Sequence, residues 1–184
     1  MADDEVALVQ GCLQGNPRAI KALVDRFQAD VYGLCVRILR HHQDAEDAAQ
    51  EIFVRVFRSL ARWDCERPLR PWIMGITLNR CRTWLTQRAR RPRATNFRLE
   101  DIAHTPDEPP GELVREIEAA VDDLRPDYRS VFILFHQHGQ GYDEISQAMD
   151  RPVGTIKTWL HRARLAVLER LRQRGMVPEN SGEG

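Results

Sequence analysis

The sequence of 184 residues lacks the features that mark membrane and secreted proteins. It has no apolar run near the roughly eighteen residues that a membrane-spanning helix needs. Its N-terminus, MADDE, is acidic and has none of the basic and apolar regions of a secretory signal peptide. We therefore expect no membrane insertion and a cytoplasmic location.

Motifs for catalysis, nucleotide binding and metal binding are also missing. The sequence contains no GxxxxGK[ST] loop, no HExxH, no ExxH pair and no GxSxG elbow. Its few cysteines are scattered without a CxxC pair, and three of them lie in helical patterns, which favours buried reduced thiols. The cysteines are Cys12, Cys35, Cys65 and Cys81. The sequence thus predicts no enzyme, no metal site and no cofactor.

Strand-like alternation is absent as well, and apolar residues recur with a helical period. Helices are expected over 4–14, 17–40 (as one long helix or two), 44–60 and 72–90, with Asp44 as the N-cap of the helix at 44–60. Together they predict an all-α domain over 4–91. Four prolines then mark a linker, 92–111, after which helical periods resume. We expect two helical domains, 4–91 and 112–175, joined by this linker and followed by a flexible tail, 176–184.

The net charge is zero, but the charges are distributed unevenly along the chain. Residues 67–93 contain eight arginines and no acidic residue. Residues 99–123 contain nine acidic residues and one arginine, and residues 151–174 contain seven basic residues and one glutamate. Two basic segments separated by an acidic one indicate two contacts with one polyanion.

The second basic segment coincides with a predicted helix-turn-helix at 142–164. Ile145, Ala148 and Met149 have the spacing of one buried helix face, and Asp150 and Arg151 occupy a turn that often holds glycine. A second helix would bury Ile156, Leu160, Ala163 and Val167. Its other face carries hydrogen-bond donors suited to a DNA groove: Thr155, Lys157, Thr158, His161, Arg162 and Arg164. The alternative is a surface helix pair with a solvated basic face.

The first basic segment mixes arginines with aromatic residues. Arginines neutralise phosphates, and aromatic rings stack on bases that have left a duplex, so residues 63–93 favour a nucleic acid. Taken singly, Trp72 and Trp84 are better explained as core residues. The preceding helix carries DAAQEIF at 47–53, which by spacing alone is a plain amphipathic helix.

Three segments of the chain resemble a known family. DAEDAAQEIFVRVFRSL (44–60) and RPWIMGITLNRCRTWL (70–85) look like region 2 of bacterial sigma factors, and YDEISQAMDRPVGTIKTWLHRAR (142–164) looks like region 4. With only these two regions, the chain is similar to the extracytoplasmic-function (ECF) group of the sigma-70 family. The resemblance implies a protein that binds core RNA polymerase, through the β′ clamp and the β subunit, and directs it to promoter DNA.

The resemblance also implies roles for individual residues. The helix at 44–60 would face polymerase through Asp47, Gln50, Glu51, Phe53 and Arg55. The −10 element, with a base flipped from its strand, would be bound by Trp63, Arg67, Arg70, Asn79, Arg80 and Arg82. The −35 duplex would be read by Thr155, Lys157, Thr158, Arg162 and Arg164. An inhibitory anti-sigma factor is a further partner that the resemblance implies.

Two places depart from the family pattern, and one other function remains open. Thr77 and Leu78 precede Asn79 where small residues are frequent in the family. Trp159 stands where the family often has arginine, on the inward side of its helix, where it would pack instead of touching DNA. The other function is that of an autonomous helix-turn-helix repressor or activator, with 4–91 as a sensor or dimerisation domain. The basic, aromatic segment at 63–93 argues against that alternative, because a repressor would not need it.

Overall fold

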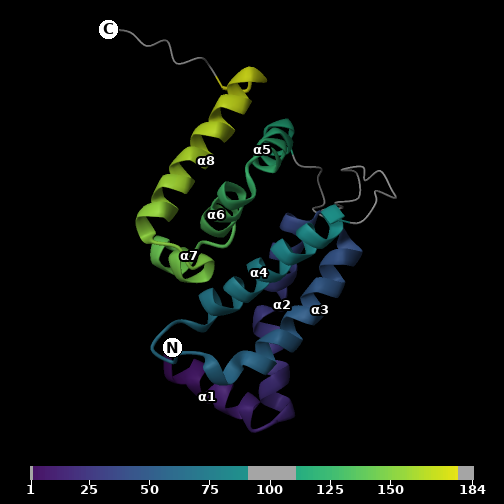
Figure 1. Cartoon of the computed structure of the whole chain (residues 1–184), viewed down its shortest axis with the longest axis vertical. Helices are drawn as coiled ribbons and strands as arrows, with labels where there is room; N and C mark the ends of the chain where they lie inside the picture. The colour runs from purple at the N-terminus through teal and green to yellow at the C-terminus, as the bar shows by residue number, and fades with distance from the viewer. Residues whose placement is uncertain (1, 91–110, 178–184) are drawn as a thin grey trace. The chain divides into compact units, whose positions relative to one another are not determined.

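The computed structural model describes residues 2–90 and 111–177, which are helical wherever they form regular structure (Figure 1). The helices are α1 (Ala2–Leu13), α2 (Pro17–Leu39), α3 (His42–Ser59), the 3₁₀ helix η1 (Leu60–Arg62), α4 (Leu69–Arg90), α5 (Glu112–Asp122), α6 (Pro126–His136), α7 (Tyr142–Met149) and α8 (Val153–Gln173). The predicted all-α class is confirmed. Apart from Gly111, Met176 and Val177, the predicted linker and tail lie outside the described residues.

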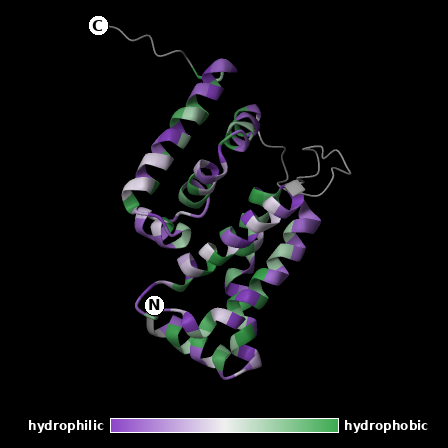
Figure 2. Cartoon of the chain, in the orientation of Figure 1, coloured by the Kyte–Doolittle hydropathy of each residue, from purple (hydrophilic) through white to green (hydrophobic). Residues whose placement is uncertain are grey.

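Helices α1–α4 form one compact unit, in which α2 packs against α1, α3 and α4. Hydrophobic and hydrophilic residues alternate along each helix, as one buried face per helix requires (Figure 2). Leu23 and Leu34 of α2, Ile52 of α3 and Ile73 of α4 are completely buried in its core. Burial of each such side chain stabilises the fold by about 1.5–3 kcal/mol relative to exposure.

The start of α3 differs from the prediction. Its N-cap is His41, whose Nδ1 accepts a hydrogen bond of 3.0 Å from the backbone N–H of Asp44. The predicted N-cap, Asp44, therefore lies inside the first turn. There its carboxylate accepts a hydrogen bond of 3.3 Å from Arg88 of α4. The prediction was wrong because a histidine ring nitrogen can also accept a capping bond, and sequence alone gives no sign that it does.

Helix α4 begins at Leu69, three residues before the predicted start at Trp72. Pro71 falls in its first turn, where proline needs no hydrogen-bond partner and its fixed φ suits the helix. The backbone N–H of Leu69, which as the first residue of α4 has no acceptor within its own helix, donates to Glu5 Oε2 of α1 at 3.0 Å. A side chain 64 residues earlier in the chain thus satisfies this helix terminus, which a local reading cannot foresee.

Helices α5, α6, α8 and the first turns of α7 form the second unit, in which α8 packs on both α5 and α6. Leu134, Ile145, Ile156 and Leu160 are buried almost completely. Arg129 of α6 bonds to Asp122 of α5 at 3.0 Å, and burial lowers the pKa of that guanidinium. The pairs Arg170–Asp123 and Arg174–Glu116 link α8 to α5.

The connection between α7 and α8 has the predicted helix-turn-helix form. Asp150 adopts φ +51°, a left-handed conformation that glycine accepts most easily and aspartate tolerates. Arg151 donates its backbone N–H to the carbonyl of Ser146, and the Ser146 hydroxyl donates to the carbonyl of Arg151. Pro152 then precedes the first residue of α8. In the described ranges, no helix is both long and apolar enough to span a bilayer.

Candidate functional site

The exposed face of α3 carries part of the predicted polymerase-binding set. Asp47, Gln50, Val54 and Arg58 are all exposed and follow one another at three- and four-residue steps, so they form a continuous stripe. Val54 is 47% exposed, although it is apolar. Neither Val54 nor Arg58 was among the residues predicted to bind polymerase, although Arg58 was expected on the outer face of this helix. The available signal was their spacing from Gln50, which places them on the same helix face.

The remaining predicted residues of α3 lie beside that stripe. Glu51 and Arg55 line a pocket against α4, together with Val54 and Arg58 of the stripe. Phe53, two residues from Glu51 and therefore on the opposite flank of the helix, is half-buried. The stripe and its pocket-facing edge thus hold four of the five predicted residues, and Phe53 lies apart from them. One flat partner surface cannot contact all five equally.

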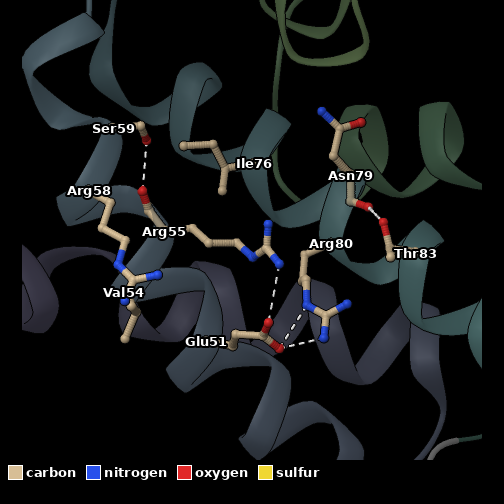
Figure 3. Close-up of a pocket in the computed structure, with 9 residues that line it drawn as sticks. All are labelled: Glu51, Val54, Arg55, Arg58, Ser59, Ile76, Asn79, Arg80 and Thr83. Atoms are coloured by element: carbon tan, nitrogen blue, oxygen red, sulfur yellow. Dashed lines mark hydrogen bonds and ion pairs between the residues drawn. The ribbon is translucent and has the colours of Figure 1, made fainter.

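Between α3 and α4 lies a pocket of about 480 Å³ (Figure 3). It is lined by Glu51, Val54, Arg55, Arg58, Ser59, Ile76, Asn79, Arg80 and Thr83. These include Glu51 and Arg55 from the predicted polymerase set and Asn79 and Arg80 from the predicted −10 set. Two groups assigned to different partners therefore meet in one place.

Glu51 is the centre of the polar contacts in this pocket (Figure 3). Its Oε2 accepts hydrogen bonds from both Nε, at 2.8 Å, and Nη2 of Arg80. Its Oε1 accepts a hydrogen bond of 3.2 Å from Arg55 Nη2. The bonds from Arg80, and secondarily those from Arg55, hold the pKa of Glu51 below its usual value. Only 8% of the Arg80 side chain is exposed, and its guanidinium lies 5.3 Å from the Trp84 ring centre.

The other predicted −10 residues differ in how exposed they are and in the contacts that they already make. Arg70 makes bonds of 2.8 and 3.1 Å to Asp30 of α2, so it fastens α4 to α2. Arg67 is exposed and pairs with Asp64 in its own loop at 3.2 Å. Asn79 is exposed, and Trp63 is half-buried. Arg82 is also half-buried, as are Trp72 and Trp84, which the sequence placed in the core.

In α8 the predicted division between inner and outer faces holds. Ile156, Leu160, Ala163 and Val167 are buried. Of the predicted −35 residues, Thr155 is half-buried and the others are exposed: Lys157, Thr158, Arg162 and Arg164. The buried stripe packs α8 on its own unit, so the exposed donors lie on the outside of that unit.

Three of these cations contact aromatic or imidazole groups of neighbouring helices. Arg164 lies over the ring of Phe135 and donates to His136 Nε2 at 3.2 Å. Although His136 is exposed overall, partial burial of its ring, and then the charge of Arg164, lower its pKa. Lys157 lies 5.6 Å from the centre of the Tyr142 ring. Such contacts restrict the long side chains before a ligand arrives and so reduce the entropy lost on binding.

On the other flank of α8, Arg162 donates to the hydroxyl of Tyr128 at 3.3 Å, which raises the pKa of Arg162. Trp159 is half-buried, with its ring centre 6.4 Å from that of Tyr128. The expectation that Trp159 packs on its own unit is consistent with this contact. Among the residues that the structure describes, no three His, Cys, Asp or Glu side chains gather where they could hold a metal ion.

Comparison with known proteins gives consistent matches over both units. A family model described as "Sigma-70 region 2" matches residues 23–91, and one described as "Sigma-70, region 4" matches residues 114–167. The RNA polymerase sigma-H factor of Pseudomonas aeruginosa is 30% identical over 178 residues, covering 90% of this chain and 92% of that protein. The ECF RNA polymerase sigma-E factor of Haemophilus influenzae is 30% identical over 171 residues, covering 86% and 90%.

Solved structures give the same fold. CnrH in complex with the cytosolic domain of CnrY matches with a TM-score of 0.69 at 22% identity, covering 91% of this chain and 96% of that one. The sigma factor RpoE in complex with the anti-sigma factor NepR from Bartonella quintana matches with a TM-score of 0.67 at 19% identity, covering 83% and 96%. At these identities the likeness bears on the fold alone.

Proposed function

The chain belongs to the ECF group of the sigma-70 family of RNA polymerase sigma factors, and we propose how its residues divide the work of promoter recognition. As a sigma factor it acts with RNA polymerase in promoter-directed initiation of transcription. Residues 4–91 would bind core polymerase and the −10 element. Residues 112–175 would bind the −35 element, and residues 92–111 would connect the two domains.

For polymerase, the proposed contact is the stripe Asp47, Gln50, Val54 and Arg58 on α3. Its observed exposure supports this assignment, because the residues described for its own unit leave all four side chains exposed. An exposed valine among polar neighbours is also what an apolar anchor in a protein interface looks like. Phe53 and Arg55 would contact the rim of this interface from the two flanks of the helix.

For the −10 element, the proposed reading surface is the loop after η1 together with α4. Trp63 and Arg67 would hold an unstacked base and its phosphate, and Asn79 would contact the strand beside them. Arg70 and Arg82 contribute positive charge to the same segment. Capture of an unstacked base offsets part of the cost of opening the duplex, so melting would be driven by binding energy.

For the −35 element, α8 would enter the major groove with its exposed face. Thr158 would lie toward the base edges, with Lys157 and Arg164 on one flank and Arg162 on the other. Flanking cations suit the two phosphate backbones of a groove. Thr155, near the start of α8, would contact the backbone closest to the helix N-terminus.

An anti-sigma factor is a further proposed partner. Both solved structures described above are complexes, and the partner of RpoE in the second, NepR, is an anti-sigma factor. A protein that works with polymerase would act in the cytoplasm. It would have no catalytic role of its own.

Run-off transcription with core polymerase tests the proposal. Replacement of both Asp47 and Gln50 by alanine should weaken defined transcripts that the unchanged protein supports. The matched control replaces Asp25 and Gln28, two exposed residues of α2, and should leave the transcripts unchanged. Equal loss in both variants, or no loss in the α3 variant, would contradict docking through the stripe.

A further inference from the structure

We infer that Glu51 is a positioning residue that fastens α4 to α3, and not a direct contact for polymerase. This inference rests on the proposed function. The contacts in the α3–α4 pocket would hold α4 in place on α3, so that polymerase bound to α3 also fixes the position of the residues of α4 that face the −10 element. This role for Glu51 replaces the one that the sequence predicted.

The first support is the geometry of the carboxylate. Both of its oxygens already accept hydrogen bonds, Oε2 from Arg80 and Oε1 from Arg55. Three of the roughly four acceptor positions of this carboxylate are thus in use, so it has little capacity left for a cation of polymerase, although its side chain is 40% exposed. The exposed carboxylate of Asp47, on the neighbouring stripe, is not engaged in this way.

The second support is the burial of Arg80. Its guanidinium lies between α3 and α4 and gives two bonds to a single oxygen of Glu51, Oε2, while only 8% of the side chain is exposed. Two bonds from one planar group to one oxygen restrict both the distance and the direction of approach. If the carboxylate were removed, a nearly buried charge would lose its partner, which is costly. Helix α4 would then have to move to hydrate Arg80.

The third support is the direction of Asn79. The Asn79 side chain points away from Glu51, whereas that of Arg80, the next residue, points toward it (Figure 3). Consecutive residues of a helix differ by about 100° in direction, so the contact that fixes Arg80 also fixes where Asn79 points. Loss of the Glu51–Arg80 pair should therefore misplace Asn79 while the exposed stripe of α3 stays intact.

A double-mutant cycle tests this role in the full-length protein with core polymerase. The variants are Glu51→Gln, Arg80→Gln and the two combined. Two quantities are measured: affinity for core polymerase, and promoter opening at saturating polymerase, from permanganate reactivity of thymines in the melted region. Melting curves of each free protein report its folding.

Each single variant should bind core polymerase within about twofold of the unchanged protein and open the promoter about three- to tenfold less, since a charged hydrogen bond is lost at a partly exposed site. The double variant should open it no less than the worse single variant, because the two side chains act as one unit. A defect that persists at saturating polymerase separates positioning from docking.

Arg26→Gln is the matched control, since Arg26 of α2 also bonds across two helices of this unit, to Asp4 and Glu5 of α1, but outside the pocket. It should leave opening unchanged. If Glu51→Gln lowered polymerase affinity equally with and without Arg80, Glu51 would contact polymerase directly and the inference would be overturned. Full opening by both single variants would overturn it as well.

If Arg80→Gln failed to fold, Arg80→Lys would replace it, because lysine keeps the charge and loses the planar guanidinium. It should show a smaller opening defect at unchanged polymerase affinity, and normal opening would count against the inference. Failure of the unchanged protein to support any transcript would instead contradict the proposed function. The two failures are therefore distinguishable.

Discussion

The guanidinium of Arg164 lies over the ring of Phe135, with 4.9 Å between its carbon and the ring centre. The contact joins the outer face of α8 to α6, so a side chain that the sequence assigned to DNA is already supported by its own unit. A cation held over an aromatic face gains about 0.5–1 kcal/mol at an exposed site. Arg164 is thus oriented before it meets a phosphate.

Replacement of Arg164 by alanine should weaken promoter binding across sequences. We expect affinity to fall about three- to tenfold, and the slope of log affinity against log salt to fall by about 1, as loss of one phosphate contact predicts. Phe135→Leu, which keeps an apolar side chain but removes the ring, should cost about two- to fivefold. Fluorescence anisotropy of holoenzyme on a labelled promoter, over a series of salt concentrations, measures both quantities.

Arg174→Ala provides the control for net charge. Arg174 lies just after the same helix and pairs with Glu116, 3.6 Å away. Its loss should leave the salt slope unchanged. Equal effects of the two substitutions would mean that Arg164 contributes only to overall charge.

The left-handed turn at Asp150 gives a prediction about stability. Both Asp150→Gly and Asp150→Ala remove the carboxylate, but only alanine keeps a Cβ, which crowds the backbone at φ +51°. The alanine variant should therefore be less stable than the glycine variant by about 1 kcal/mol. Urea unfolding followed by circular dichroism measures the difference. At Asp123, where φ is −78°, the same two substitutions should not favour glycine.

Sequence periodicity was enough to predict the helices and their buried faces. Ile156, Leu160 and Val167 repeat at the spacing of one face, and all three are buried. The reason is that a helix packs with one side inward, so each of its residues reports on the same burial pattern. The helix-turn-helix and the two-part division of the chain followed from such local signals.

The polar contacts of the candidate site could not be predicted in this way. Glu51 and Arg80 are 29 residues apart and pair only because α3 and α4 lie side by side. The family resemblance assigned them to different partners, since it compares positions one at a time. The His41 cap was missed for a different reason, because it is a choice between two nearby acceptors that local sequence does not decide.

The cysteines differ in their expected reactivity. Cys65 is exposed, whereas Cys12, Cys35 and Cys81 are buried. A hydrogen bond with Cys81, 3.7 Å away, and burial both raise the pKa of Cys35, so its thiolate is strongly disfavoured. Burial likewise raises the pKa of Cys12.

A thiol-reactive dye such as Ellman's reagent should therefore label one thiol of the native protein quickly and the rest only after unfolding. Cys65→Ser should abolish the fast phase. A different result would be one thiol, not three, in the unfolded Cys65→Ser variant, with a mass two hydrogens below that of the reduced chain. That result would show that Cys35 and Cys81 form a disulfide in the native state.

Stability should depend on pH through His136. Burial, followed by the charge of Arg164, lowers the pKa of this imidazole in the folded protein below its ordinary value of 6.5. At a pH between the pKa values of His136 in the folded and unfolded states, this imidazole binds a proton in the unfolded chain but not in the folded protein. The contribution of His136 to stability is therefore complete above the unfolded pKa and is lost as pH falls through and below it.

Urea unfolding between about pH 7.5 and pH 5 measures this dependence on either side of the ordinary histidine pKa. His136→Gln keeps an acceptor for Arg164 and removes the titration, so its free energy of unfolding should fall less steeply on acidification. Arg164→Gln removes only the smaller cause and should give an intermediate slope. If the unchanged protein gained stability relative to His136→Gln as the pH fell, the folded state would favour the imidazolium, and the assigned direction of the pKa shift would be wrong.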